Sequence, residues 1–187
     1  MAVTPSTMKL ETGAPAPDFA LPNHNGDGSI IRLADFKQKN ATLIFFACNH
    51  CPYVVHIAEA IADLAKDYLP KNVAIAAINS NDIQNYPEDA PEKMKPFAQK
   101  YGWTFPYLFD ETQETARAYH AACTPDFFLF DKNHKLAYRG QLDDSRPGNS
   151  IPPAGEHLRA ALDAVLQNKP APANQKPSVG CNIKWKR

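Results

Sequence analysis

The segment "ATLIFFACNHCPYVVHIAEAIADLAKDYL", residues 41–69, joins an apolar run, two cysteines and an amphipathic pattern. The run at 41–47 is too short for a helix and rich in large side chains, which is typical of a central strand covered on both faces. After Pro52, apolar residues recur near helical spacing with Asp and Lys opposite them, which predicts a helix packed on the sheet. A strand that leads directly into a helix would place Cys48 and Cys51 at the turn between them.

The flanking sequence predicts further strands and helices in alternation. The turn pairs at residues 25–28 indicate an N-terminal β-hairpin, and residues 72–80 indicate a second buried strand. Two apolar runs around "DKNHK" within residues 126–142 predict another hairpin, and "GEHLRAALDAVLQN" predicts a final helix. This order favours an α/β fold with a central mixed sheet flanked by helices.

The chain of 187 residues fits one domain with short appendages. We expect the domain to occupy residues 1–167. Residues 168–187 form a proline-rich tail that carries Cys181 and shows no periodicity. We expect this extended tail to be either loose or pinned to the domain as a strap.

Charge and hydropathy narrow the classes of partner. Lys+Arg and Asp+Glu number 20 each, so we expect neither a nucleic-acid partner nor an anionic membrane surface. No apolar run approaches the roughly 18 residues of a membrane span, and the start of the sequence lacks the features of a secretory signal. We therefore expect a cytoplasmic protein, and in the cytosol a close cysteine pair is typical of catalysis or metal binding.

The chemistry of the pair follows from its place at the turn. Near a helix N-terminus, a thiol pKa can fall from about 8.5 into the range of roughly 3.5–7.5, because free N–H groups and the helix dipole favour negative charge. We expect Cys48 to be the nucleophile in this position and Cys51 to be the resolving thiol. A protonated His50 between them would stabilise the thiolate further. This chemistry requires no bound cofactor.

Several ordered motifs carry a family resemblance. They are "GAPAPDFALPN", "ATLIFFACNHC", "GWTFPYLFDETQETARAYHAACTPDFFLFDKNHKLAYRG" and "PSVGCNIKW", spread over about residues 10 to 187. Together they resemble the thioredoxin-like redoxins, in the peroxiredoxin-like branch of the alkyl hydroperoxide reductase/thiol-specific-antioxidant superfamily. The resemblance implies a thioredoxin-like fold and an antioxidant or thiol-exchanging enzyme. It also implies that Thr124-Pro125 is a cis step that lies against the dithiol and contacts the substrate.

The sequence also departs from the patterns of its relatives. A peroxiredoxin places Pro-x-x-x-Thr-x-x before its peroxide-reactive cysteine; reading back from Cys51, Ile44 and Cys48 stand at the proline and threonine positions. Thioredoxin carries Trp-Cys-Gly-Pro-Cys, whereas here Ala47 precedes Cys48. We therefore expect a thiol–disulfide oxidoreductase acting on protein or small-molecule thiols and disulfides.

Two alternatives stay open at this point. One is a thiol peroxidase that reduces hydroperoxides with Cys48 or Cys51, with Cys123 or Cys181 as the resolving thiol. The other is a Cu(I)- or Zn-binding, metallochaperone-like protein that adds ligands from His50, His56, His120 or Cys123 to the pair. In simpler interpretations, Cys123 is a small buried hydrophobe and Cys181 is an incidental thiol.

Overall fold

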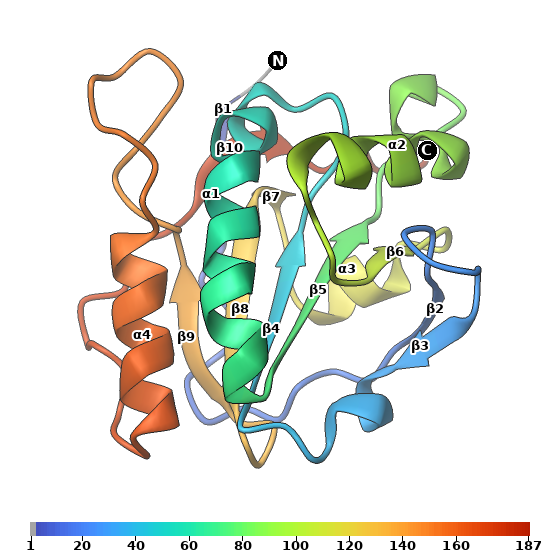
Figure 1. Ribbon diagram of the computed structural model, residues 1–187. Coiled ribbons are helices and arrows are strands. Elements are labelled where there is room, and N and C mark those ends of the chain that lie inside the picture. The colour runs from blue at the N-terminus through green and yellow to red at the C-terminus, as the bar shows by residue number, and fades with distance from the viewer. Residues whose placement is uncertain (1–2) are drawn as a thin grey trace.

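Strand β4 (Ala41–Phe46) lies at the centre of a five-stranded mixed sheet in the computed structural model, which describes residues 3–187 (Figure 1). On one side it pairs in parallel with β5 (Val73–Asn79), and β6 (Tyr107–Phe109) continues the sheet. On the other side it pairs antiparallel with β8 (Asp126–Asp131), followed by β9 (Leu136–Gly140). The predicted α/β fold with a mixed sheet is confirmed.

Helices cover both faces of this sheet. Leu43 and Phe45 of β4 pack in a core with α1 (Pro52–Tyr68), α2 (Pro91–Tyr101) and α4 (Glu156–Leu166). Ile44 and Phe46 point to the opposite face, toward α3 (Glu114–Ala118) and the N-terminal segment. This alternation is the period-2 geometry of a strand, and it explains why all six residues of β4 are buried. Within residues 3–187, no helix has both the length and the apolar character needed to cross a bilayer.

Shorter elements follow the turn signals of the sequence. The predicted N-terminal hairpin is present as β2 (Ala20–Pro22) and β3 (Ile30–Arg32). Helix α1 begins with a proline, which lacks the N–H group that would be unpaired there, and α2 ends at Gly102 in the left-handed region with φ 73°. The described part of the chain also contains the 3-10 turns η1 (Leu33–Phe36), η2 (Leu69–Lys71) and η3 (Pro87–Asp89).

The C-terminal tail is pinned to the domain. Its strand β10 (Val179–Asn182) lies between β1 (Val3–Pro5) and β7 (Cys123–Thr124) in a three-stranded antiparallel sheet. Figure 1 shows β1 and β10 beside the N-terminal end of α1. Of the two expected states of the tail, the structure has the extended strap. The tail is therefore attached to the domain through β10, and the division between domain and tail after residue 167 stays a prediction.

The packing of β4 gives a prediction for stability. Phe45 is fully buried, and its ring lies 5.3–5.8 Å from those of Trp103, Phe105 and Phe127. We expect Phe45→Ala to lower the free energy of unfolding by about 3–5 kcal/mol, because a core cavity replaces these contacts. Ile30→Ala, at a side chain that is 48% exposed, is the control, and its effect should stay within about 0.5 kcal/mol in the same denaturant titration. Equal losses in both variants would contradict this account.

Candidate active site

The two cysteines of the C-x-x-C sequence lie at the junction of β4 and α1. Cys48 follows the strand in the connecting turn, and Cys51 is the N-cap residue of α1. Their exposed fractions are 1% and 0%. The predicted strand-to-helix placement is therefore present, but the residue at the helix N-terminus is Cys51 and not Cys48. The cause is that Pro52, with its fixed φ, takes the first helical position.

The loop between β7 and β8 lies against this pair. The Thr124-Pro125 peptide bond is cis, as the family resemblance implied. Oγ1 of Thr124 lies 3.4 Å from Sγ of Cys48, and the backbone carbonyl oxygen of Thr124 lies 3.2 Å from Sγ of Cys51. One residue of this loop thus touches both sulfur atoms.

A third sulfur completes the cluster. Sγ of Cys181 lies 2.8 Å from Sγ of Cys51, although the two residues are 130 positions apart in the chain. Strand β10 brings it there, because Cys181 is paired directly with Thr124. Cys181 is 3% exposed. The sequence left its role open, and the structure places it in direct contact with the C-x-x-C pair.

Among the three sulfur atoms of the cluster, the thiolate form is favoured at Cys51. Hydrogen bonding with Cys181 is the largest cause, and hydrogen bonding with Cys48 the next, of a pKa of Cys51 that is lowered despite burial. Thr124 and Val54 make smaller contributions in the same direction. The carbonyl of Thr124 opposes ionisation, since it can accept only from the protonated form. Burial raises the pKa of Cys48, and donation to Cys51 and the charge of Asp89 raise it further. The expected lowering at Cys48 is therefore wrong, because burial of this thiol outweighs the effect of the helix N-terminus.

His50 is paired with a buried carboxylate that the sequence analysis did not single out. Its Nδ1 lies 2.7 Å from Oδ2 of Asp89, close enough for an ion pair although the ring N–H is not aligned on the oxygen. The contact with Asp89 is the main reason that the pKa of His50 is raised, against a smaller opposing effect of burial. The ring also stacks on Tyr86 at 5.8 Å. A positive charge beside the sulfur atoms, as expected from the sequence, is consistent with this geometry.

Asp89 also fixes the backbone of the turn. Its Oδ1 accepts hydrogen bonds from the backbone N–H of Asn49 at 2.7 Å and of His50 at 3.2 Å. Its Oδ2 accepts from the side-chain amide of Asn81 at 2.8 Å. Asp89 has no exposed surface, and both oxygens of this buried carboxylate accept hydrogen bonds. It holds the residues between the two cysteines from the side of β5.

Cys123 stands apart from the reacting sulfur atoms. It is fully buried, its thiol faces the carbonyl oxygen of Pro125 at 3.5 Å, and desolvation raises its pKa well above the ordinary value. These contacts agree with the simpler interpretation of a small buried hydrophobe.

The donor set suits a metal ion poorly. Within residues 3–187, the candidate metal-binding group is formed by Cys48, His50 and Asp89, whose donor atoms lie within 4.8 Å of one another. The His50 and Asp89 donors are already engaged with each other and with the backbone. Two of the other expected ligands, His120 and Cys123, lie outside the group. His56 is also outside it, and its Nε2 lies 2.7 Å from Oγ of Ser145.

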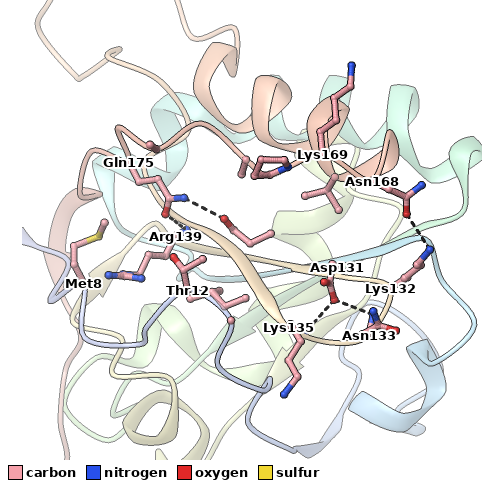
Figure 2. Close-up of a pocket in the computed structure, with 17 residues that line it drawn as sticks. Met8, Thr12, Asp131, Lys132, Asn133, Lys135, Arg139, Asn168, Lys169 and Gln175 are labelled. Atoms are coloured by element: carbon pink, nitrogen blue, oxygen red, sulfur yellow. Dashed lines mark hydrogen bonds between the residues drawn. The ribbon is translucent and has the colours of Figure 1, made fainter.

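A hollow of about 760 Å³ lies at the other end of the sheet (Figure 2). Its lining includes Asp131, Arg139 and Gln175, with the backbone N–H of Arg139 donating to the Gln175 side chain at 3.1 Å. Asp131 pairs with Ala41, the first residue of β4, whereas Cys48 follows the last. This hollow is therefore separate from the sulfur cluster.

A cysteine pair between a central strand and a helix, faced by a cis-proline loop, defines the class of thioredoxin-like proteins. Residues 12–139 match the family model described as the AhpC/TSA family, and the chain belongs to this family. The matched region contains Cys48, Cys51 and Thr124-Pro125, and it ends before the tail that carries Cys181.

Known proteins resemble the chain in sequence and in three-dimensional structure. The thiol-disulfide oxidoreductase ResA of Geobacillus kaustophilus is 32% identical over 133 residues, which is 68% of this chain and 67% of the relative. The crystal structure of an uncharacterized conserved protein from Geobacillus kaustophilus is 57% identical with a TM-score of 0.96, covering 100% of this chain and 97% of the other. That of the hypothetical protein SMc02350 from Sinorhizobium meliloti 1021 is 49% identical with a TM-score of 0.94, covering 98% of each chain.

The sulfur cluster predicts that Cys181 controls the ionisation of Cys51. In Cys181→Ala the contact that contributes most to the lowered pKa of Cys51 is lost, so we expect that pKa to rise. The thiolate absorbance in the ultraviolet should then disappear at a higher pH than in the parent protein as the solution is acidified. Cys123→Ala, which removes a buried thiol that does not donate to Cys51, should leave the titration unchanged. A titration that is the same in all three proteins would contradict the proposed donor.

The buried carboxylate predicts the charge state of His50. In Asp89→Asn we expect the pKa of His50 to fall, because its main stabilising partner is neutralised, and NMR titration of the imidazole would measure this. In the parent protein, the stability contributed by protonated His50 should be fully present below pH 6.5 and lost as pH rises through the raised pKa. Glu88→Gln, an exposed carboxylate one residue away, should leave the pKa of His50 in place.

Proposed function

We propose that the protein is a thiol–disulfide oxidoreductase that uses Cys48 and Cys51 as its redox pair. The observation that carries this proposal is the contact of Thr124, beside the cis-proline, with both sulfur atoms of the pair. Two thiols held at the same turn can form a disulfide without moving the surrounding sheet. Membership of the AhpC/TSA family and the similarity to ResA support the same class of reaction.

In the first step, the sulfur of Cys48 attacks a disulfide of the partner. As the attack proceeds, the proton of Cys48, whose pKa is raised by burial, ends on the departing sulfur of the partner. One sulfur of the partner becomes bonded to Cys48, and the other leaves as a thiol. Cys51 remains a thiolate through this step, because its pKa is lowered.

In the second step, Cys51 resolves the mixed disulfide. Its thiolate attacks Sγ of Cys48, the bond between Cys48 and the partner breaks, and the partner sulfur leaves as a thiolate that takes up a proton from solvent. The products are a reduced partner and a Cys48–Cys51 disulfide. The lowered pKa of Cys51 favours this attack, because the thiolate is the reactive form.

His50 tunes the balance between the two redox states. Its raised pKa keeps positive charge near the sulfur atoms, and that charge stabilises the thiolate of the reduced pair. Stabilising the reduced form makes the disulfide easier to reduce, so we propose a relatively oxidising potential.

The substrate would be a protein or small-molecule disulfide that lies along Thr124 and Pro125. A peroxidase function is less favoured, because Ile44 and Cys48 replace the residues that orient peroxide in peroxiredoxins. The cytoplasmic location stays a prediction.

Redox titration tests this function. Equilibration in glutathione buffers, followed by alkylation and mass spectrometry, should reveal a Cys48–Cys51 disulfide in the oxidised protein. Cys48→Ser and Cys51→Ser should each lower the rate of reduction of a model disulfide protein by at least ~100-fold, because the two thiols act as a unit. Cys123→Ser is the matched control and should retain the rate of the parent protein.

Cys51→Ser should also accumulate the mixed disulfide between Cys48 and the model protein, since the resolving thiol is absent. An oxidised protein without the Cys48–Cys51 linkage would sink the proposal. Oxidation of the pair by hydrogen peroxide that is faster than oxidation by any disulfide would favour a peroxidase instead.

A further inference from the structure

Strand β10 covers the redox pair in this structure. It pairs with β7 along the edge next to the cis-proline loop, and Cys181 lies opposite Thr124. Cys48 and Cys51 are 1% and 0% exposed beneath it. The hollow that borders Pro125 and Val179 measures about 20 Å³, which is room for roughly one water molecule. We therefore expect a partner chain to reach the sulfur atoms after β10 has moved.

The sequence of the tail fits the position of β10 beside Thr124. A methyl group added at Gly180 would lie 2.0 Å from the carbonyl oxygen of Thr124, so a glycine is required where β10 pairs with β7. Beyond the strand, Ile183 donates its backbone N–H to Ala122 at 3.0 Å. The carbonyl oxygen of Lys184 accepts from the backbone N–H of Asp82 and from the side chain of Gln113, both at 2.8 Å. The strand is therefore anchored at the site and after it.

The contact that this docking creates is between two sulfur atoms. At 2.8 Å, Sγ of Cys181 lies a short displacement from the roughly 2.05 Å of a disulfide bond to Cys51. The Cys51 sulfur therefore has two thiols as neighbours, Cys48 on its own turn and Cys181 on the tail. Either could be its disulfide partner.

We propose that Cys181 is a third redox-active thiol, which exchanges with the Cys48–Cys51 disulfide to form a Cys51–Cys181 disulfide. This inference rests on the proposed function, which supplies the oxidised pair. The sulfur of Cys181 attacks Sγ of Cys51, the Cys48–Cys51 bond breaks, and the proton lost by Cys181 ends on Cys48. One disulfide replaces another, so no further oxidant is consumed.

The two disulfide isomers differ in what they do to the tail. A Cys51–Cys181 bond ties β10 covalently over the site and leaves Cys48 as a free thiol. A Cys48–Cys51 bond leaves β10 held by hydrogen bonds alone, so it can leave the edge that a partner chain needs. Cys181 would thus stand in for the sulfur of a substrate and close the site when no partner is present.

Disulfide mapping of the full chain tests this role. No lysine or arginine lies between Cys48 and Cys51, so trypsin leaves them in one peptide and Cys181 in another. After oxidation with oxidised glutathione, we expect Cys48→Ser to form the linked Cys51–Cys181 peptides. Its content of the Cys51–glutathione adduct should be at least ~10-fold lower than in Cys48→Ser/Cys181→Ser, because the tail thiol is held at a high effective concentration.

Two controls separate docking of the strand from other effects. Gly180→Ala in the Cys48→Ser background should reduce the Cys51–Cys181 linkage by ~10-fold or more, since the added methyl group displaces β10. Gly148→Ala, where an added methyl group meets no atom within 4 Å, should leave the linkage intact. Cys123→Ser in the same background should also leave it intact.

The outcomes distinguish the two proposals. If Cys181→Ser still forms the Cys48–Cys51 disulfide while Cys48→Ser gives free thiols or a glutathione adduct, the role of Cys181 is overturned and the proposed function stands. If Cys181→Ser fails to form the Cys48–Cys51 disulfide, the proposed function itself fails.

Discussion

The close pairing of β10 with β7 is the constraint on which the sulfur chemistry depends. It sets the distance between the sulfur atoms of Cys51 and Cys181, and it buries both members of the C-x-x-C pair. A thiol in a dry environment normally resists ionisation. Here the cost is offset at one sulfur, because hydrogen bonding with neighbouring groups lowers the pKa of Cys51, whereas burial dominates at Cys48 and Cys123. The network therefore decides which sulfur carries the charge.

A second constraint acts from the opposite side of the turn. The carboxylate of Asp89 holds the backbone N–H groups of Asn49 and His50 and pairs with the His50 ring. It raises the pKa of Cys48 through its own charge and raises that of His50 through the same charge. One buried anion thus helps to keep the first thiol protonated while it maintains a cation beside the pair. This arrangement leaves the thiolate at Cys51, the sulfur that resolves the mixed disulfide.

Local patterns in the sequence were sufficient for the main elements of the fold. The apolar run of β4, the turn residues of the β2–β3 hairpin and the periodicity of α1 each depend on neighbours along the chain, and each was predicted. The place of the tail was not decided, because β10 pairs with β1 and β7, which lie far away in sequence. Gly180 offered a signal in the sequence, but its meaning depends on the carbonyl oxygen of Thr124.

The site was predicted less completely than the fold. The motif identified the residues of the pair and the cis-proline loop, whereas the direction of the pKa shifts came from contacts across the fold. The helix N-terminus argued for a lowered pKa at Cys48, but the N-cap position and the contacts that lower a thiol pKa belong to Cys51. Asp89 is the last residue of the 3-10 turn η3, which follows β5, and it belongs to no motif. Its importance depends on the meeting of two parallel strands at one edge of the sheet.

The three-stranded sheet of β1, β10 and β7 joins both termini of the protein to the redox centre. Strand β1 forms the outer side of β10, and Ser6 and Ser178 extend this pairing with a backbone hydrogen bond of 2.8 Å. An affinity tag or fusion partner attached ahead of β1 would therefore pull on the strand that shields the cysteines. Recombinant versions that differ only in such an extension should differ in how fast the cysteines react, even though their catalytic residues are identical.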